Sequence, residues 1–225
     1  GSGQAIDLKY VEASSREISK YARGHTIVVE KSTLPVKTAQ TIKAILDAAT
    51  EDVNKSKITK TFSVLSNPEF LAEGTAISDL ENPDRVLIGG EDKEAINELV
   101  NIYSKWIDKV KVLTTDLWSS ELSKLISNAF LAQRISSINT ISALCEATGA
   151  RIKDVSLAVG MDRRIGKYFL NSGPGFGGSC FKKDISNLVY ISNHYGLFEV
   201  ANYWQKVLDI NSWQQKRFVE LIVKK

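Results

Sequence analysis

The sequence has few of the residues that build disulfide frameworks or metal centres. It contains only two cysteines and two histidines among 225 residues. Cysteines 35 positions apart make neither a disulfide framework nor a zinc site, and His25 and His194 have no metal-ligand spacing. We therefore expect no bound metal. A free thiol suits a reducing compartment, so we expect a cytoplasmic protein.

Long apolar runs and a strong net charge are also missing. No stretch approaches the roughly 18 residues of a membrane span, and no signal peptide is visible. The formal charge of +3, without a Lys/Arg-rich run, does not favour binding to nucleic acid. With 43% hydrophobic and 24% charged residues, the composition is that of a globular protein with a substantial core. We expect neither a membrane nor a nucleic-acid partner.

Strand and helix patterns alternate through the first half of the chain. Short β-branched or apolar runs predict four strands, and helical periodicity predicts the segments between or before them. Strands separated in this way usually pair in parallel, with helices on the sheet faces. We therefore predict an α/β fold with a partial Rossmann-like parallel sheet. The predicted strands are 25–30, 62–65, 85–88 and 110–113, and the predicted helices are 5–21, 37–49 and 93–107.

Polar loops follow the first two predicted strands. Residues 30–35 present hydroxyl groups before Pro35, and residues 66–74 carry Glu69 and Glu73, two carboxylates four positions apart. Ligands of parallel sheets bind beyond the carboxyl ends of the strands, so both loops are candidates for a site. A solvated loop edge would equally explain Glu69 alone.

The second half of the sequence is predicted to be helical. Its longest helix, 117–148, would be about 48 Å long, and its apolar residues cover more than one stripe. Such a helix packs against several partners, and a second subunit is a candidate for one of them. Lys124 and Asn128 project from one face of it. Lys124 is either a buried lysine suited to acid/base work or a surface lysine with a buried stem. Shorter helices are predicted at 153–159, 181–195 and 198–223.

A glycine-rich loop precedes the helix predicted at 181–195. Four glycines between 173 and 178 remove side chains that would bar a ligand, so their N–H groups can surround a phosphate. Paired arginines at 163 and 164 also suit an anionic ligand. The spacing of these glycines matches a dinucleotide fingerprint as well, but the strand before it and the acidic residue about 20 positions after it are missing.

Cys180 ends this loop. Ser179 is the predicted N-cap, so Cys180 lies in the first helical turn, with Lys182 and Lys183 close by. The helix dipole and the lysines both favour the thiolate, and Asp184 lies one turn further along the same face. The alternative is a buried structural cysteine, the interpretation we give to Cys145.

Several blocks of this sequence resemble the UDP-glucose/GDP-mannose dehydrogenase family. They occur in the family's order and span most of the chain, and the run Ser-Ser-Glu-Leu-Ser-Lys-Leu is similar to the eukaryotic branch. The resemblance implies an NAD-dependent, four-electron oxidation of UDP-glucose to UDP-glucuronate, in at least a dimer. The blocks are 30–33 with 35–36, 66–77, 82–90, 119–128, 133–139, and 175–180 with 183–184.

The resemblance also implies roles for individual residues. Cys180 would capture the C6 aldehyde as a thiohemiacetal and then carry a thioester. Lys124 would be the acid/base or oxyanion stabiliser, with Asn128 and Asp184 aligning the alcohol and then the water. Glu69 would be the base of thioester hydrolysis, assisted by Thr33.

The implied binding residues fall into two groups. Those for the UDP-sugar are Glu69, Phe70, Leu71, Ala72, Glu73, Lys124, Asn128, Arg164, Asn171, Ser172, Gly173, Pro174, Gly175, Phe176 and Gly177, where Arg164 would reach a neighbouring subunit's site. Those for NAD are Thr33, Glu73, Cys180 and Lys183.

The sequence departs from the family pattern at both ends. The family opens with a strand, a G-x-G-x-x-G turn and a helix, and closes with a second α/β domain, and we find neither. We expect a central fragment, with residues 1–115 from the NAD-binding domain and residues 116–225 as a helical dimerisation and substrate domain. Alone, it should neither bind NAD tightly nor turn over. Oxidation of another nucleotide sugar, such as GDP-mannose or a UDP-N-acetylhexosamine, and a non-catalytic UDP-sugar-binding core remain alternatives.

Overall fold

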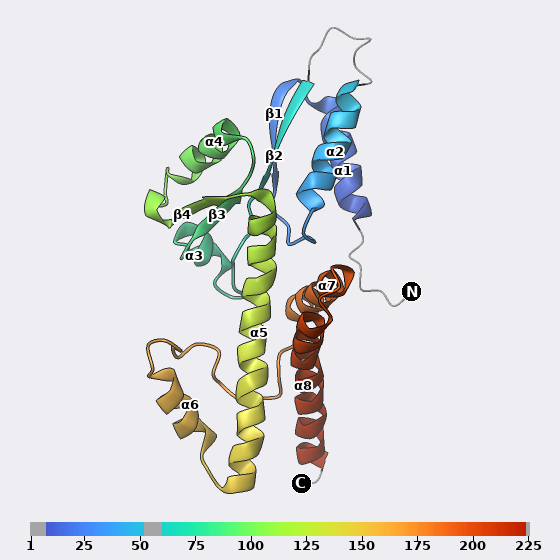
Figure 1. Ribbon diagram of the computed structural model, residues 1–225. Coiled ribbons are helices and arrows are strands. Elements are labelled where there is room, and N and C mark those ends of the chain that lie inside the picture. Colours follow the sequence, from blue (N-terminus) through green and yellow to red (C-terminus); the bar gives the residue numbers. More distant parts are fainter. Residues whose placement is uncertain (1–7, 52–59, 224–225) are drawn as a thin grey trace. The chain divides into compact units, whose positions relative to one another are not determined.

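The computed structural model describes residues 8–51 and 60–223 (Figure 1). The chain divides into two compact units, one up to Lys124 and the other from Leu125 onward. Helix α5, Leu117–Thr148, contains the boundary between them. We therefore describe an α/β unit and a helical unit, each by itself.

The α/β unit confirms the predicted alternation of strands and helices. The largest difference is in the helix predicted at 93–107, which ends at Tyr103 because Ser104 begins a turn. The last strand lies two residues later than predicted, and the limits of the other strands and of the helix predicted at 37–49 differ by one or two residues. The predicted start of the first helix, residues 5–7, lies outside the described residues. Helix α3 was not predicted, since six residues are too few to show a helical period. The elements are α1 Lys9–Tyr21, β1 Gly24–Glu30, α2 Thr38–Glu51, β2 Lys60–Ser66, α3 Ala76–Glu81, β3 Val86–Gly89, α4 Lys93–Tyr103, the 3₁₀ turn Lys109–Lys111 and β4 Val112–Thr115.

The sheet has the order β1-β2-β3-β4, and one pairing corrects the prediction of parallel strands throughout. β1 pairs with β2 in parallel and β3 with β4 in parallel, but β2 meets β3 antiparallel through Ser66 and Gly89 alone. The connection from β2 to β3 contains only α3, which is about 9 Å long, whereas β2 extends about 23 Å. Such a short helix does not return the chain along the full length of β2.

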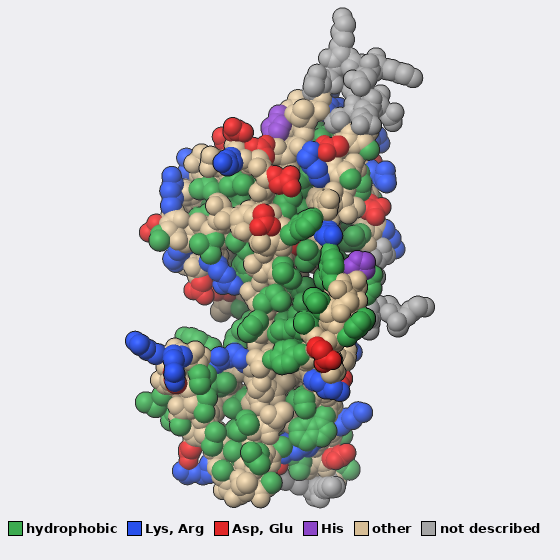
Figure 2. Space-filling view, in the orientation of Figure 1, with side chains coloured by type: hydrophobic (Ala, Val, Ile, Leu, Met, Phe, Trp, Pro, Cys, Tyr) green, Lys and Arg blue, Asp and Glu red, His purple; other side chains and the backbone are tan. Residues whose placement is uncertain are grey.

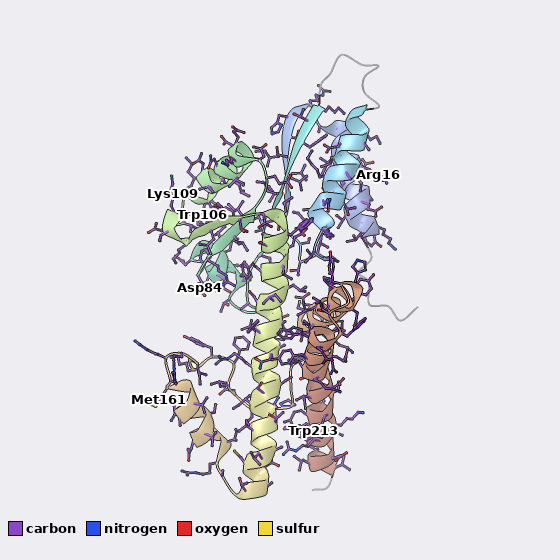
Figure 3. The ribbon with its side chains drawn as sticks, in the orientation of Figure 1. Arg16, Asp84, Trp106, Lys109, Met161 and Trp213 are labelled. Carbon is purple, nitrogen blue, oxygen red and sulfur yellow. The ribbon has the colours of Figure 1, made fainter. Side chains whose placement is uncertain are left out.

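Helices cover the sheet with two apolar clusters. On one side, α1 and α2 pack against β1 and β2 around Leu46, Phe62 and Val64 (Figure 1). On the other, α4 packs on the sheet around Leu65, Ile88 and Leu99. Trp106, labelled in Figure 3, stacks near Tyr103 and donates Nε1 to the backbone oxygen of Leu80, which ties the end of α4 to α3. β3 and most of β2 are thus buried on both faces, whereas β1 is mostly half-buried and β4 is half-buried to exposed.

The helical unit contains the rest of α5 with α6 Ile152–Gly160, α7 Cys180–His194 and α8 Phe198–Val223. The predicted limits of α5 and α8 are confirmed, and α7 begins one residue earlier than predicted. Its core joins α5, α7 and α8 through ten buried side chains that include Leu125, Ile185 and Trp204. In Figure 1, α6 lies on the opposite side of α5 from α8.

Two carboxyl groups are buried in the α/β unit. Glu30 is 7% exposed, and its Oε1 is the one buried oxygen without a hydrogen-bond partner among the described side chains. Burial, reinforced by repulsion from Glu121, raises the pKa of Glu30 to about 8, although Lys31 and a hydrogen bond with Ser66 oppose the shift. Burial also raises the pKa of Glu121, although the backbone N–H groups of Ala39 and Lys37 lower it.

The Glu30 carboxyl makes a prediction about stability and pH. Because the folded state binds this proton more tightly than the unfolded state, the contribution of Glu30 to stability is full below pH 4.5 and is lost as pH rises toward about 8. Glu30→Gln should therefore raise the free energy of unfolding at pH 9 by on the order of 5 kcal/mol more than at pH 4. Urea unfolding at both pH values measures this difference. The exposed Glu98→Gln is the control, and an equal effect of Glu30→Gln at both pH values would contradict the prediction.

Candidate active site

Cys180 is exposed at the first residue of α7. The interpretation as a buried structural cysteine is therefore wrong for Cys180, whereas Cys145 is buried in α5 as predicted. Ser179 is the N-cap, as predicted, but its side chain makes no capping hydrogen bond. A thiol at a helix N-terminus with open access is available for covalent chemistry.

A polar pair lies in the same unit. Asn128 on α5 donates from Nδ2 to Oδ2 of Asp184 at 2.6 Å. Asp184 is only 2% exposed and stands one helical turn beyond Cys180. A buried carboxylate held by an amide keeps a fixed orientation, which a group that aligns an alcohol or a water requires. Two of the predicted site residues are thus brought together.

A second pair lies in the α/β unit. Nζ of Lys124 is 3.5 Å from Oε2 of Glu69, and the lysine is 6% exposed. Oε2 also accepts the backbone N–H of Leu71 at 3.0 Å, which fixes the carboxylate in its own loop. Lys124 is therefore a buried, paired lysine and not the surface lysine of the alternative interpretation.

The Phe70 ring contacts two cations in this part of the fold. The Arg85 guanidinium carbon lies 3.8 Å from the ring centroid, and Nζ of Lys124 lies 5.4 Å from it. Cations above an aromatic face are attracted by its quadrupole. Phe70 thus stabilises Lys124 from one direction while Glu69 pairs with it from another. Arg85 was not among the predicted site residues.

The other predicted residues of the α/β unit lie in loops beyond the strands. Thr33, after β1, and Leu71, after β2, are half-buried, whereas Ala72 and Glu73 are exposed. The backbone N–H of Ala72 donates to Asp79 at 2.9 Å, which shapes this turn.

In the helical unit, Arg164 and Lys183 are exposed. Arg164 pairs with Asp162 at 2.7 Å, and hydrogen bonds from Arg164 hold the pKa of Asp162 below its ordinary value. The loop around Arg164 is held by Arg134 on α5, whose guanidinium donates to three backbone oxygens: those of Ile165, Gly166 and Tyr168.

Two N–H groups of the glycine loop have protein partners, so they are not available to the phosphate that the sequence predicts there. The N–H groups of Gly173 and Phe176 instead donate to side-chain oxygens of Asn139 on α5 and Asn211 on α8. The glycines are needed for shape: Gly175 has φ +109°, and a Cβ there would lie 2.5 Å from Oδ1 of Asn211. Asn171, Ser172, Pro174 and Gly177 complete the loop, with Asn171, Pro174 and Gly177 exposed.

Asn67, Glu121, Arg134, Asn139 and Asn211 were missed by the sequence reasoning. They are polar residues next to or inside predicted elements, and the side chains of Asn67, Glu121, Asn139 and Asn211 are buried. Glu121 accepts the N–H groups of Lys37 at 2.6 Å and Ala39 at 2.7 Å, so it caps the start of α2. For the four residues on α5 and α8, a polar residue within an apolar helical pattern was the available signal.

Ser63, Asp92 and His25 are the residue types of a catalytic triad, but they are not connected in the order that a triad requires. Ser63 donates to Asp92, and its oxygen lies 3.3 Å from Nε2 of His25, whose Nδ1 contacts Thr61. In a catalytic triad the histidine stands between the carboxylate and the nucleophile, whereas here Ser63 stands between them. Asp92 is also occupied as the N-cap of α4. We assign this cluster a structural role.

Residues 8–51 and 60–223 contain neither a cluster of metal-binding side chains nor a helix that could span a membrane. No group of three or more His, Cys, Asp or Glu side chains in this part of the chain could hold a metal ion. No helix within it is long and apolar enough to cross a membrane.

Comparison with known proteins identifies close relatives. The chain is 58% identical over 227 aligned residues to the UDP-glucose 6-dehydrogenase of Caenorhabditis elegans, and 56% identical to that of Mus musculus. Each alignment covers 99% of this chain but only 46% and 45% of the relative. The chain thus spans about half the length of the curated relatives it matches.

Solved structures agree with the fold. A UDP-glucose dehydrogenase from the archaeon Pyrobaculum islandicum matches 95% of this chain and 48% of its own, with a TM-score of 0.83 and 34% identity. A UDP-D-ManNAc dehydrogenase from Pyrococcus horikoshii has the same fold, with a TM-score of 0.81 at 23% identity.

Family models match both parts of the sequence. Residues 1–107 match the NAD binding domain of the UDP-glucose/GDP-mannose dehydrogenase family, and residues 118–213 match the family's central domain. Together with the identities above, these matches show that the chain belongs to the UDP-glucose/GDP-mannose dehydrogenase family.

Proposed function

We propose that this chain supplies the catalytic middle of an enzyme that oxidises UDP-glucose to UDP-glucuronate with NAD. Its relatives named UDP-glucose 6-dehydrogenase are 56–58% identical across 99% of its length, and this observation carries the proposal. The exposed thiol of Cys180 supplies the nucleophile that the chemistry requires. A reaction that depends on a free thiol suits the cytoplasm.

The reaction consists of two oxidations and one hydrolysis. The C6 alcohol loses a hydride and a proton to give an aldehyde, and the thiol of Cys180 adds to it as a thiohemiacetal. This adduct loses a second hydride and a proton to give a thioester. Water then cleaves the carbon–sulfur bond, which releases the carboxylate and regenerates the thiol. Bound NAD supplies the hydride acceptor for each oxidation, so two NAD molecules are reduced per sugar.

Each polar pair serves a different part of this sequence. Lys124 takes the proton of the alcohol when it is a neutral amine, or stabilises the oxyanion when it is an ammonium group, because a buried positive charge acts strongly on a developing negative charge. Glu69, assisted by Thr33, activates the water that cleaves the thioester. Asn128 and Asp184 align first the alcohol and later the water.

The binding residues follow the same assignment. The segment from Glu69 to Glu73, the loop from Asn171 to Gly177 and the partner-directed Arg164 bind the UDP-sugar. Thr33, Glu73, Cys180 and Lys183 bind NAD, with Thr33 and Glu73 near its nicotinamide end. The pairing of β1 and β2 supports the placement of Thr33 and Glu73 in one site. Glu30 pairs with Ser66, so the two strands end side by side and the loops that follow them share one edge of the sheet. Residues 1–115 therefore belong to the NAD-binding domain, and residues 116–225 form the substrate and dimerisation domain.

A second copy of the chain is the proposed partner of the helical unit. Large apolar side chains on α5, on α6 and directly after α6 are exposed, including Leu144 at 58%, Leu157 at 67% and Met161 at 77%. Figure 2 shows hydrophobic side chains gathered over this unit, and Figure 3 labels Met161 at the end of α6. Such side chains are typically covered in an assembly. Arg164, in the loop after α6, then has access to the neighbouring copy.

Two other functions are weaker. A related nucleotide sugar, such as GDP-mannose or a UDP-N-acetylhexosamine, would use the same two-step chemistry, but the relatives of highest identity described above are named for UDP-glucose. A non-catalytic UDP-sugar-binding core would need no accessible thiol, whereas Cys180 is exposed and stands one turn from the Asp184–Asn128 pair. Both remain outcomes of the experiments below.

Cys180→Ser tests the covalent mechanism. A serine hydroxyl forms no thioester, so uronate formation by the complete enzyme should fall by about 10²-fold or more. UDP-glucuronate and NADH are measured with UDP-glucose and NAD, and Cys145→Ser is the matched control, which should retain activity. Unchanged uronate production by Cys180→Ser would exclude the mechanism, and turnover with GDP-mannose in place of UDP-glucose would exclude the substrate.

Glu69→Gln should separate hydrolysis from oxidation. The amide keeps the shape of Glu69 but accepts no proton, so the thioester on Cys180 should accumulate while steady-state turnover falls about 10²- to 10⁴-fold. Intact-mass spectrometry of the enzyme after UDP-glucose and NAD detects the adduct, and the exposed Glu81→Gln is the control. Loss of turnover without an adduct would instead assign Glu69 to an earlier step.

Substitution of the exposed apolar side chains tests the partner. Leu157→Glu combined with Met161→Glu should convert a dimer into a monomer, because burial of two charges opposes association. Sedimentation of the chain measures its mass, and Leu80→Glu, an exposed leucine of the α/β unit, should leave it unchanged. A monomeric unsubstituted chain would contradict the proposal.

A further inference from the structure

Side chains of α8 hold the backbone of the glycine loop. Asn211 bonds both backbone groups of Phe176, and Nε2 of Gln215 also donates to the backbone oxygen of Phe176, at 3.1 Å. Oδ1 of Asn211 accepts the N–H of Phe176 at 2.8 Å, and Nδ2 of Asn211 donates to the oxygen of the same residue at 3.0 Å. A side-chain amide that bonds both groups of one residue acts as a paired strand would. Asn211 and Phe176 are each 7% exposed, so water does not readily replace these bonds.

The loop is shaped to accept this amide. Gly175, immediately before Phe176, has φ +109°, and a Cβ added to it would lie 2.5 Å from Oδ1 of Asn211. Only glycine combines this backbone angle with such a close approach. The glycine and the asparagine therefore form one device, although 36 positions separate them in the sequence.

A second pair of amides holds the beginning of the loop. Asn139 on α5 accepts the N–H of Gly173 at 2.9 Å, and Gln214 on α8 donates to the oxygen of Gly173 at 2.7 Å. Asn139 is fully buried and Gln214 is 3% exposed. The loop is thus fixed at two residues by side chains from two helices.

The Phe176 ring extends this restraint to the nucleophile. It lies in the core of the helical unit and packs edge-on against the Phe181 ring, with 5.6 Å between the centroids and an interplanar angle of 89°. Phe181 is the residue after Cys180. A contiguous path therefore leads from the Asn211 amide through two aromatic rings to the first turn of α7.

We propose that Asn211 is a positioning residue, which sets the glycine loop for the sugar nucleotide and holds the start of α7 where Cys180 stands. Asn211 does not touch the reacting atoms and acts through Phe176. The inference rests on the proposed function for the identity of the ligand, UDP-glucose. The restraint of the loop itself is independent of that identity.

Hydrogen exchange of the 225-residue chain tests the restraint. Asn211→Leu keeps the approximate size but makes no hydrogen bond, so amides at 173–178 should exchange about tenfold faster or more, while those at 185–192 in α7 keep their rates. Asn211→Asp, which keeps the acceptor for the Phe176 N–H, should lie between Asn211→Leu and the unsubstituted chain. It also decides the test if Asn211→Leu does not fold. Asn202→Leu, exposed on the same helix, is the control.

Protection of Cys180 from alkylation tests whether Asn211 affects the binding of UDP-glucose. UDP-glucose should slow the alkylation of Cys180 by iodoacetamide, with buried Cys145 as the internal reference. In Asn211→Leu, the concentration for half-protection should rise roughly tenfold, because the competent loop is less populated. A merely structural role would lower the melting temperature without moving this concentration.

The outcomes distinguish a failure of the positioning role of Asn211 from a failure of the proposed function. Unchanged exchange of the loop in folded Asn211 variants overturns the positioning role, as does faster exchange with unchanged half-protection. An unsubstituted chain that UDP-glucose does not protect overturns the proposed function instead, and the exchange rates then decide the restraint alone.

Discussion

The α/β unit depends on the hydrogen bonds of one buried amide, that of Asn67. Its backbone N–H bonds the oxygen of Glu30 at 2.8 Å, which continues the pairing of β1 and β2 beyond their last residues. Its Nδ2 donates to the oxygen of Leu87 in β3 at 2.7 Å, and its Oδ1 accepts the Tyr103 hydroxyl of α4 at 2.6 Å and Nζ of Lys31 at 3.2 Å. The chain leaves the sheet directly after Asn67 and reaches Glu69 two residues later, so this restraint determines where the candidate base begins.

In the helical unit, buried side-chain amides also hold backbone, here that of the glycine loop. The glycine loop has no strand beside it to satisfy its backbone, and buried backbone groups without partners are costly. Side-chain amides of Asn139, Asn211 and Gln214 replace the missing strand. In both units, buried amides fix the backbone at the point where regular structure ends and a candidate catalytic residue follows. Rigid loops of this kind reduce the reorganisation that a reaction must complete.

The sequence was most informative where a local pattern determines the structure. The limits of α5 and α8 were predicted because long helical periods end at clear signals, and the strands because β-branched runs are short and bounded. The antiparallel contact between Ser66 and Gly89 could not be predicted, because it depends on how far the chain travels between two strands. α3 was too short to show a period.

The hydrogen-bond partners of polar side chains were the feature that the sequence predicted least well. An asparagine in a helical pattern looks the same whether it faces water or a distant loop, and Asn211 lies 35 positions from the backbone group that it bonds. The catalytic candidates themselves were recognised from their resemblance to a family. The pairs Lys124–Glu69 and Asn128–Asp184 emerged only from the fold, because their members lie 55 and 56 positions apart.

Buried charged groups lie where function is proposed, and their burial lowers the stability of the fold. Glu30, Glu121 and Lys124 are each less than 10% exposed, and all lie in the α/β unit near the carboxyl ends of its strands or on α5. Apolar residues of similar size would make a more stable core, since the desolvation of charges opposes folding. The clusters around Leu46 and Leu65 offset this opposition from the two faces of the sheet. Glu121 shows what such a buried charge contributes. Its carboxylate accepts the N–H of Lys37, which has a strained φ of +78°, and so fixes the end of the loop that carries Thr33. A sequence selected for stability alone would have no reason to retain that arrangement, whereas one selected to hold a loop for chemistry would.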